Sequence, residues 1–471
     1  MLFAFLLSGT FASAAQESGK EYDWMEKAVE QLRAQDYTGC ISTTEEVLKR
    51  DAKNTDALTL RGRAKLYAND PEGAVADCTS AIRFNIRSKE ALAIRGAAYC
   101  DLWKFDESLK DLNQAIALDP KFAEAFGYRA ITKGKSGDLN GALTDINRAL
   151  ALDPGMNPNY QTRRHIREMI GDLKGALEDA DRLVTFYPKS AEQHFKRGQL
   201  KMKINDLQSA EADLDRAIEL NPDDEFQLFT RGEILMRQDR FKEAEADYSR
   251  LIALEPDDAS NFMRRGDARY HQGNDQGALE DYSHSIQIKP MARAFIYRGM
   301  INHRLGLYIK AMDDMNEAIR IDPKETRGFG NRGIIRCSTD DHAGAILDYS
   351  ECVKLDPEDD MAMYRRGICQ QHSGNHRKAI EDFSAALILH PEHGEVYGSR
   401  GYSKLELKDA KGAIEDFSKA IRFLPADPRG YLFRGLARKM SDDLKGACAD
   451  WKQAAALGSE EAAEHMKTVC R

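Results

Sequence analysis

Apolar and polar residues follow one another at the spacing of amphipathic helices along most of the chain. In residues 225–258, a first apolar stripe recurs at helical intervals; it consists of Phe226, Leu228, Phe229, Ile234 and Leu235. The polar residues 238–240 follow, and a second stripe comes after them, formed by Phe241, Ala244, Tyr248, Leu251 and Ile252. The pattern predicts two helices joined by a tight turn.

This helix pair recurs with a period of 34 residues. An Arg-Gly dipeptide marks the period at Arg61, Arg95, Arg197, Arg231, Arg265, Arg298, Arg332, Arg366, Arg400 and Arg434. One step, from Arg265 to Arg298, is 33 residues long. The predicted thirteen units start near residues 21, 55, 89, 123, 157, 191, 225, 259, 292, 326, 360, 394 and 428, and they end at 458.

Other positions keep the same period. Position 20 of the unit is almost always Ala, and position 32 is Pro in ten units, from Pro120 to Pro425. Small residues let two helix backbones approach closely, and Pro cannot continue a helix. A single helix pair cannot bury its apolar face, so each unit must stack on its neighbours.

These residues resemble the tetratricopeptide repeat, and the resemblance covers more than 90% of the chain. It implies an all-α fold, a right-handed superhelical α-solenoid of helix-turn-helix repeats whose first helices line a concave groove. Residues 459–471, with Ser459 as the helix N-cap, are expected to form a capping helix that covers the last repeat.

The chain departs from the family at position 7, where Arg replaces the usual Leu in twelve units, and position 23 is Asp in twelve units. In an antiparallel helix pair these positions lie at the same height, so we expect a structural ladder of ion pairs in which each rung cancels its own charge. Its rungs include Arg61–Asp77, Arg95–Asp111, Arg231–Asp247 and Arg265–Asp281. The alternative is a binding strip.

Unit 157–190 is the weakest match, because Arg164 occupies the small-residue position 8. We expect local strain or a change of curvature there.

Residues 1–14 read as a secretory signal peptide, with an apolar run before an Ala12-Ser13-Ala14 cleavage pattern. No Lys or Arg precedes the run, so an apolar terminal helix is the alternative. Export allows disulfides. We expect one between Cys448 and Cys470, with Cys78 and Cys100 as a weaker candidate pair.

Composition changes the picture little. The 471 residues carry a net charge of −9, without the positive field of a nucleic-acid binder, and no later segment is long and apolar enough for membrane insertion. Four histidines cluster in one repeat, at His372, His376, His390 and His393, but their spacing does not make a metal site. The sequence also contains no CxxC pair, no phosphate-binding loop and no catalytic motif. We therefore expect no enzyme, no cofactor and no metal.

The resemblance implies that first-helix positions 2, 5, 9, 12 and 13 face the groove. The candidate peptide-contacting residues are Phe195, Met202, Phe229, Glu233, Met236, Arg237, Met263, Asp267, Tyr270, Met300 and Tyr364. Methionine and aromatic side chains beside a few charges suit peptide capture, although they could instead pack on neighbouring helices.

The sequence thus predicts a secreted or periplasmic, non-enzymatic scaffold that binds other proteins or peptide segments. An accessory subunit that recruits substrates to an enzyme and a self-associating cell-envelope component are the alternatives.

Overall fold

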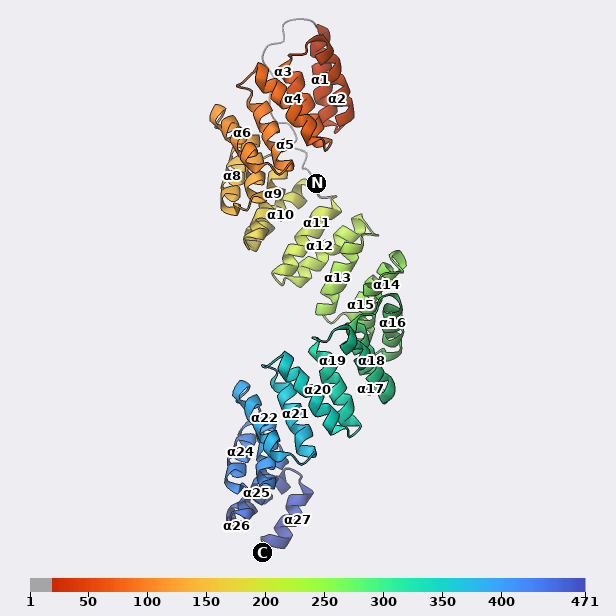
Figure 1. Cartoon of the computed structure of the whole chain (residues 1–471), viewed down its shortest axis with the longest axis vertical. Coiled ribbons are helices and arrows are strands. Elements are labelled where there is room, and N and C mark those ends of the chain that lie inside the picture. Colours follow the sequence, from red (N-terminus) through yellow and green to blue (C-terminus); the bar gives the residue numbers. More distant parts are fainter. Residues whose placement is uncertain (1–18, 471) are drawn as a thin grey trace. The chain divides into compact units, whose positions relative to one another are not determined.

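A computed structural model describes residues 19–470, so the signal peptide predicted at 1–14 lies outside the described residues. The described chain contains 27 α-helices and no strand. It forms two compact units, Met1–Gln238 and Asp239–Arg471. Within each unit, every helix packs against the one before and the one after it (Figure 1).

The helices of the first unit are α1 (Gly19–Arg33), α2 (Tyr37–Arg50), α3 (Thr55–Tyr67), α4 (Pro71–Phe84), α5 (Lys89–Asp101), α6 (Phe105–Leu118), α7 (Ala123–Lys135), α8 (Leu139–Leu152), α9 (Asn157–Met169), α10 (Leu173–Phe186), α11 (Ala191–Lys203), α12 (Leu207–Leu220) and α13 (Glu225–Arg237). Those of the second are α14 (Phe241–Leu254), α15 (Ala259–His271), α16 (Asp275–Ile288), α17 (Ala292–Arg304), α18 (Tyr308–Ile321), α19 (Thr326–Ser338), α20 (His342–Leu355), α21 (Asp360–His372), α22 (His376–Leu389), α23 (Gly394–Glu406), α24 (Ala410–Phe423), α25 (Pro428–Met440), α26 (Leu444–Ala456) and α27 (Glu460–Val469).

The turns inside the helix pairs share one backbone design. Position 15 of every repeat has a positive φ, as at Asn69 (65°) and Gly137 (96°), which ends the first helix in the left-handed conformation. The next residue is usually an Asp or Asn that caps the second helix. Asp70, for example, accepts a hydrogen bond of 2.9 Å from the backbone N–H of Gly73. This local chemistry turns the chain back on itself without help from distant residues.

Close contact between the two helices of a repeat depends on glycine at position 8. A Cβ on Gly367 would lie 2.6 Å from Cε1 of Phe383, and one on Gly266 would lie 2.9 Å from Cε1 of Tyr282. The large residue at position 24 therefore packs directly on glycine backbone, and Phe383 and Tyr282 are fully buried.

The repeat at residues 157–190 differs from the others on both sides of this contact. Arg164 takes the place of the glycine, and Ala180 takes the place of the large residue. Helix α9 is continuous over Asn157–Met169. Its unusual feature is a buried charged side chain. The Nε and Nη1 of Arg164 are buried without a hydrogen-bond partner among the described residues, and burial lowers the pKa of this guanidinium.

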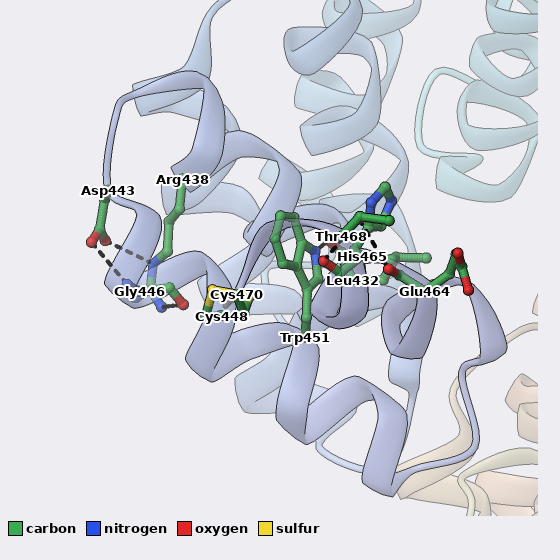
Figure 2. Close-up of a disulfide and its surroundings, with 10 residues drawn as sticks. All are labelled: Leu432, Arg438, Asp443, Gly446, Cys448, Trp451, Glu464, His465, Thr468 and Cys470. Carbon is green, nitrogen blue, oxygen red and sulfur yellow. Dashed lines mark hydrogen bonds and ion pairs between the residues drawn. A yellow bond between two sulfur atoms is a disulfide. The ribbon is translucent and has the colours of Figure 1, made fainter.

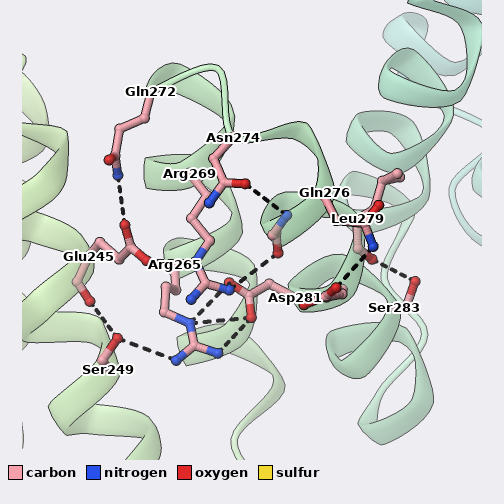
Figure 3. A network of polar contacts seen from close by, with 12 residues as sticks. Glu245, Ser249, Arg265, Arg269, Gln272, Asn274, Gln276, Leu279, Asp281 and Ser283 are labelled. Carbon is pink, nitrogen blue, oxygen red and sulfur yellow. Dashed lines mark hydrogen bonds and ion pairs between the residues drawn. The ribbon is translucent and has the colours of Figure 1, made fainter. Parts of the chain in front are cut away.

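Arg–Asp pairs connect the two helices of most repeats, and most of these arginines also reach the repeat before; Figure 3 shows the pair of Arg265 and Asp281. Arg265 donates from Nη2 to Oδ1 of Asp281 at 2.7 Å and from Nη1 to Oγ of Ser249, in the preceding repeat, at 3.3 Å. The pairs Arg61–Asp77 and Arg95–Asp111 have the same geometry, with closest contacts of 2.6 Å. The predicted pair Arg231–Asp247 would join the two units and stays a prediction; Arg231 donates to Asp215 at 2.8 Å.

The predicted Arg–Asp pairs are present in most repeats, but they are not isolated pairs. A second cation contacts most of the buried aspartates, as when Arg269 Nη1 reaches Oδ2 of Asp281 at 3.0 Å. Equivalent cations are Lys65, Lys133, Arg167, Lys201, Arg336, Lys404 and Arg438. Several of these cations also contact a further carboxylate, as when Arg269 Nε lies 2.7 Å from Oε1 of Glu245, so the rungs belong to larger ion-pair networks.

Helix α27 covers the end of the second unit (Figure 2). Ser459 caps it by accepting from the backbone N–H of Ala462, and a disulfide joins Cys448 on α26 to Cys470. Trp451 is fully buried beneath the helix, where His465 stacks on its ring at 4.9 Å. The other candidate pair, Cys78 and Cys100, is not a disulfide: both cysteines are free and buried.

Candidate functional site

A cavity of about 620 Å³ opens along the first helices of the last three repeats, on α21, α23 and α25. It lies wholly within the second unit. Its lining residues are Tyr364, Gln371, His372, Gly374, His376, Gly394, Glu395, Gly398, Ser399, Tyr402, Glu406, Phe417, Ala420, Leu424, Asp427, Arg429, Gly430 and Phe433.

Glycine in the middle helix makes room for this cavity. Gly398 stands at groove position 5, where the preceding repeat has Tyr364 and the following one has Leu432. A Cβ on Gly398 would meet only the Cβ of Ala420, at 4.0 Å, so the backbone is open to a ligand. Tyr364 lines the cavity, whereas Leu432 is 5% exposed and packs in the core beside Trp451.

Aromatic rings form the walls. Tyr402 meets Phe433 edge-on with ring centroids 5.4 Å apart, and Phe433 stacks on Phe417 at 5.9 Å. Tyr364 contacts His393 and Phe383 at 5.7 and 6.0 Å. Rings held on both sides by other rings offer flat apolar surface with little conformational freedom to lose on binding.

Among the Asp, Glu, Lys and Arg residues that line the cavity, three are acidic and one is basic. Arg429 is held by Asp427 through contacts of 2.8 to 3.0 Å, and this hydrogen bonding lowers the pKa of the Asp427 carboxyl. Burial, followed by the nearby charge of Glu406, raises the pKa of Tyr402. Glu395 and Glu406 add two exposed carboxylates, so the cavity carries more negative than positive charge.

Of the residues predicted to face a peptide, Tyr364 alone lines this cavity. Met263 and Asp267 are 9% and 5% exposed, which corrects the expectation that a partner can reach them. Met263 packs beside Tyr282 in the core, and Asp267 accepts hydrogen bonds from Tyr282 Oη at 2.9 Å and Arg293 at 2.7 Å.

The other predicted groove residues lie outside the cavity. Phe195 and Met202 pack against Leu214, whereas Tyr270 and Met300 pack on the edges of other core clusters. Phe229, Glu233 and Met236 are half-buried, and Arg237 is exposed. For these residues peptide contact stays a prediction.

The groove side of repeats two to four is closed by its own side chains. Arg63 on α3 donates to both carboxylate oxygens of Glu124 on α7, at 2.6 and 3.0 Å, and both residues are buried. Tyr128 donates to Glu124 at 3.2 Å, and its hydroxyl lies 3.3 Å from that of Tyr67. Opposite charges at groove positions two repeats apart were the sequence signal for this network.

A second group that sequence reasoning missed combines Cys337, His342 and Cys369. One ligand atom from each lies within 4.8 Å of the other two. Cys337 and Cys369 belong to different repeats and form no motif along the chain. The candidate histidines His372 and His376 both line the cavity, and His372 stacks on His342 at 5.0 Å.

Comparison with known proteins gives one family. Two models described as tetratricopeptide repeat match the chain, one at residues 229–290 and 370–428 and the other at 191–224 and 292–325. No curated protein matches its sequence.

Several solved structures resemble the chain. The hetero-tetramer Cut9–Hcn1 of the APC/C is 14% identical over 96% of this chain and 97% of that chain, with a TM-score of 0.39. The C-terminal part of a TPR repeat-containing protein from Cytophaga hutchinsonii is 19% identical over 51% of this chain and all of its own (100%), with a TM-score of 0.44. YrrB, described as a TPR protein with an unusual peptide-binding site, is 18% identical over 38% of this chain and 93% of its own, with a TM-score of 0.33.

Proposed function

The chain is a tetratricopeptide repeat protein, a tandem helical repeat solenoid, and from this premise we propose that it is a non-enzymatic scaffold that captures a peptide segment of a partner protein. Repeats of this family commonly mediate protein–protein interactions and are typically non-catalytic. We place the peptide over α21, α23 and α25, in the cavity around Gly398.

The observation that carries this proposal is the contrast between the two groove surfaces. Over repeats two to four, the Arg63–Glu124 pair already occupies the groove with buried side chains. Around Gly398 the equivalent surface is open and is lined by aromatic rings and carboxylates. An extended peptide needs such an opening for its backbone and pockets for its side chains.

The chemistry of the cavity indicates the kind of peptide. Glu395 and Glu406 present carboxylates that suit a Lys or Arg side chain, because a charge-assisted hydrogen bond is stronger than a neutral one. Tyr402 and Phe433 suit an aliphatic or aromatic side chain beside it, and a cation over either ring gains further attraction. We therefore expect a basic–apolar segment.

A displayed library of random peptides, selected with the full chain, tests this proposal. The selection should enrich Lys or Arg next to an apolar residue. The variants Glu395→Lys and Glu406→Lys should weaken the selected peptides about tenfold each, which corresponds to about 1.4 kcal/mol. Glu415→Lys, an exposed change on α24 outside the cavity lining, is the matched control and should change affinity less than twofold.

Peptides that bind Glu395→Lys and Glu406→Lys as tightly as the parent would move the site elsewhere. Gly398→Trp provides a second check, because an indole would fill the opening. It should abolish binding while circular dichroism shows the same helix content.

We also propose that the protein works outside the cytosol, in the secreted or periplasmic space. The Cys448–Cys470 disulfide supports this location, because oxidising compartments preserve structural disulfides. Cell fractionation, with mass spectrometry of the mature N-terminus, tests both the location and cleavage near Ala14.

A further inference from the structure

Two cysteines and a histidine from three consecutive helices meet beside the peptide cavity. Cys337 lies near the end of α19, His342 is the first residue of α20, and Cys369 lies on α21. The two sulfur atoms are 2.6 Å apart, and one nitrogen of His342 lies within 4.8 Å of both.

The repeat architecture holds these three residues in place. Cys337 and His342 flank a turn in which Asp340 has a φ of 61° and Asp341 caps α20 by accepting from Gly344 N–H at 2.9 Å. Cys369 comes from the next repeat and is 1% exposed, packed with Ala345 and Tyr349. The side chains therefore converge because of the fold rather than because of a local motif.

The cluster has the chemistry of ligands rather than of an apolar core. The Nδ1 of His342 is buried and has no hydrogen-bond partner among the described residues. Its Nε2 lies 4.0 Å from Oδ1 of the exposed Asp340, which is beyond hydrogen-bond distance.

We propose that Cys337, His342 and Cys369 bind one thiophilic cation of the Zn²⁺ class. Two thiolates and one imidazole are the soft and borderline ligands that zinc prefers, and together they balance its charge and leave a fourth, tetrahedral position for water. Zn–S bonds of about 2.3 Å place two thiolates roughly 3.8 Å apart, so rotation of the two cysteine side chains by about an ångström completes the site. A disulfide between the same sulfurs would use neither His342 nor its free nitrogen.

Titration of the reduced full chain with Co²⁺, in the absence of oxygen, tests the proposal. One equivalent should bind and produce the near-ultraviolet absorption of thiolate-to-cobalt charge transfer, and Zn²⁺ should then displace it. The variants Cys337→Ser and Cys369→Ser should lose the band, and His342→Ala should weaken binding at least about tenfold. Cys352→Ser is the matched control, because Cys352 is a buried free cysteine on the same α20 whose thiol donates to the backbone of Thr326.

A second measurement does not depend on the folding of a variant. Zn²⁺ added to the parent chain should protect Cys337 and Cys369 from alkylation, as measured by mass spectrometry of peptides, and should leave Cys352 unchanged. A parent chain without the cobalt band, a band that survives Cys369→Ser, or a purified chain in which a Cys337–Cys369 disulfide has consumed both ligands would each overturn the proposal.

Discussion

At the scale of single residues, the repeat depends on an exchange of volume between positions 8 and 24. Glycine at position 8 leaves space that a large position-24 side chain fills, as Phe383 does beside Gly367. Where Arg164 replaces the glycine, Ala180 replaces the large residue. In this repeat the two positions have changed together.

This dependence predicts opposite effects for two glycine substitutions. Gly367→Ala should destabilise the fold by about 1–3 kcal/mol, because its Cβ would stand 2.6 Å from the Phe383 ring. Gly134→Ala, where the nearest atom is 3.9 Å away, should be neutral or stabilising by about 0.5 kcal/mol, because alanine restricts the unfolded chain. Urea unfolding of both variants measures the difference, and equal midpoints would show that the close contact is unimportant.

The buried aspartates are a second determinant at this scale. Asp281 → Ala would leave Arg265, which is 17% exposed, and Arg269 without their shared carboxylate. We expect a loss of about 2–4 kcal/mol of unfolding free energy, because an unpaired and largely buried charge remains. Asp257→Ala, at an exposed turn in the preceding loop, is the control and should stay within about 0.5 kcal/mol of the parent. If both variants unfold at the same urea concentration, the ladder does not stabilise the fold.

At the scale of helices, the rung at Asp213 joins three of them. Arg197 on α11 donates from Nε to Asp213 on α12 at 2.9 Å and from Nη1 to Asp181 on α10 at 3.0 Å. Lys201 Nζ also lies 2.7 Å from Asp213, and His194 Nδ1 lies 3.7 Å from it. One carboxylate thus holds the helix pair of its own repeat and fixes an arginine that reaches the repeat before it.

The rung at Asp213 should make stability depend on acid. Burial raises the pKa of this carboxyl, but hydrogen bonds from Arg197 and Lys201 outweigh burial, so the folded-state pKa lies below the ordinary value of an aspartate. A carboxyl whose pKa is lower in the folded than in the unfolded chain stabilises the fold at pH values above its unfolded-state pKa. This contribution is lost as the pH falls through about 4 and below. Asp213→Asn should therefore be less stable than the parent at pH 7, and the difference in unfolding free energy between the two should be smaller at pH 3. Urea midpoints of both proteins at the two pH values measure this difference, and a difference that does not change with pH would contradict the argument.

The C-terminal helix depends on a covalent link as well as on packing. The Cys448–Cys470 bond closes a segment with a sequence separation of 22 residues, over a core of Trp451, Leu432 and Ala462. Replacing both cysteines by Ser should cost about 2–4 kcal/mol of local stability. Hydrogen exchange should show α27 losing protection first, and a reducing agent should then have no further effect on the variant. Unchanged protection of α27 would mean that Trp451 packing alone holds it.

At the scale of the whole molecule, stability is expected to be a sum over neighbouring repeats, so the terminal faces need separate cover. At the C-terminal end, α27 covers Trp451 and the apolar residues around it.

Among the described residues, none of the helices combines the length and the apolar character that a membrane span requires.

Removal of the cap should therefore change the association state. A chain that ends at Gly458, with Cys448→Ser to avoid a new free thiol, would expose the Trp451 face. We expect it to form oligomers at increasing concentration in light scattering, while the parent at the same concentration is the reference. A truncated chain that behaves like the parent at every concentration would show that this face does not need a cover.

The sequence by itself determined the family and the fold. Helical spacing, the 34-residue period and the Gly, Ala and Pro columns predict an all-α tandem repeat, and this prediction is confirmed. These features could be predicted because they arise from contacts within one repeat or between adjacent repeats. The residues that make each contact recur at the same position of many repeats, so the pattern is visible in the sequence.

Only the tertiary structure decided which part of the groove is open. The closing pair Arg63–Glu124 spans 61 residues and crosses a whole repeat, and the burial of Met263 and Asp267 depends on the side chains chosen by neighbouring helices. Likewise, Cys337 and Cys369 are 32 residues apart in the sequence, and they come together only because α19 and α21 bring them there in the fold. Such contacts occur once each, so the repeating positions do not specify them.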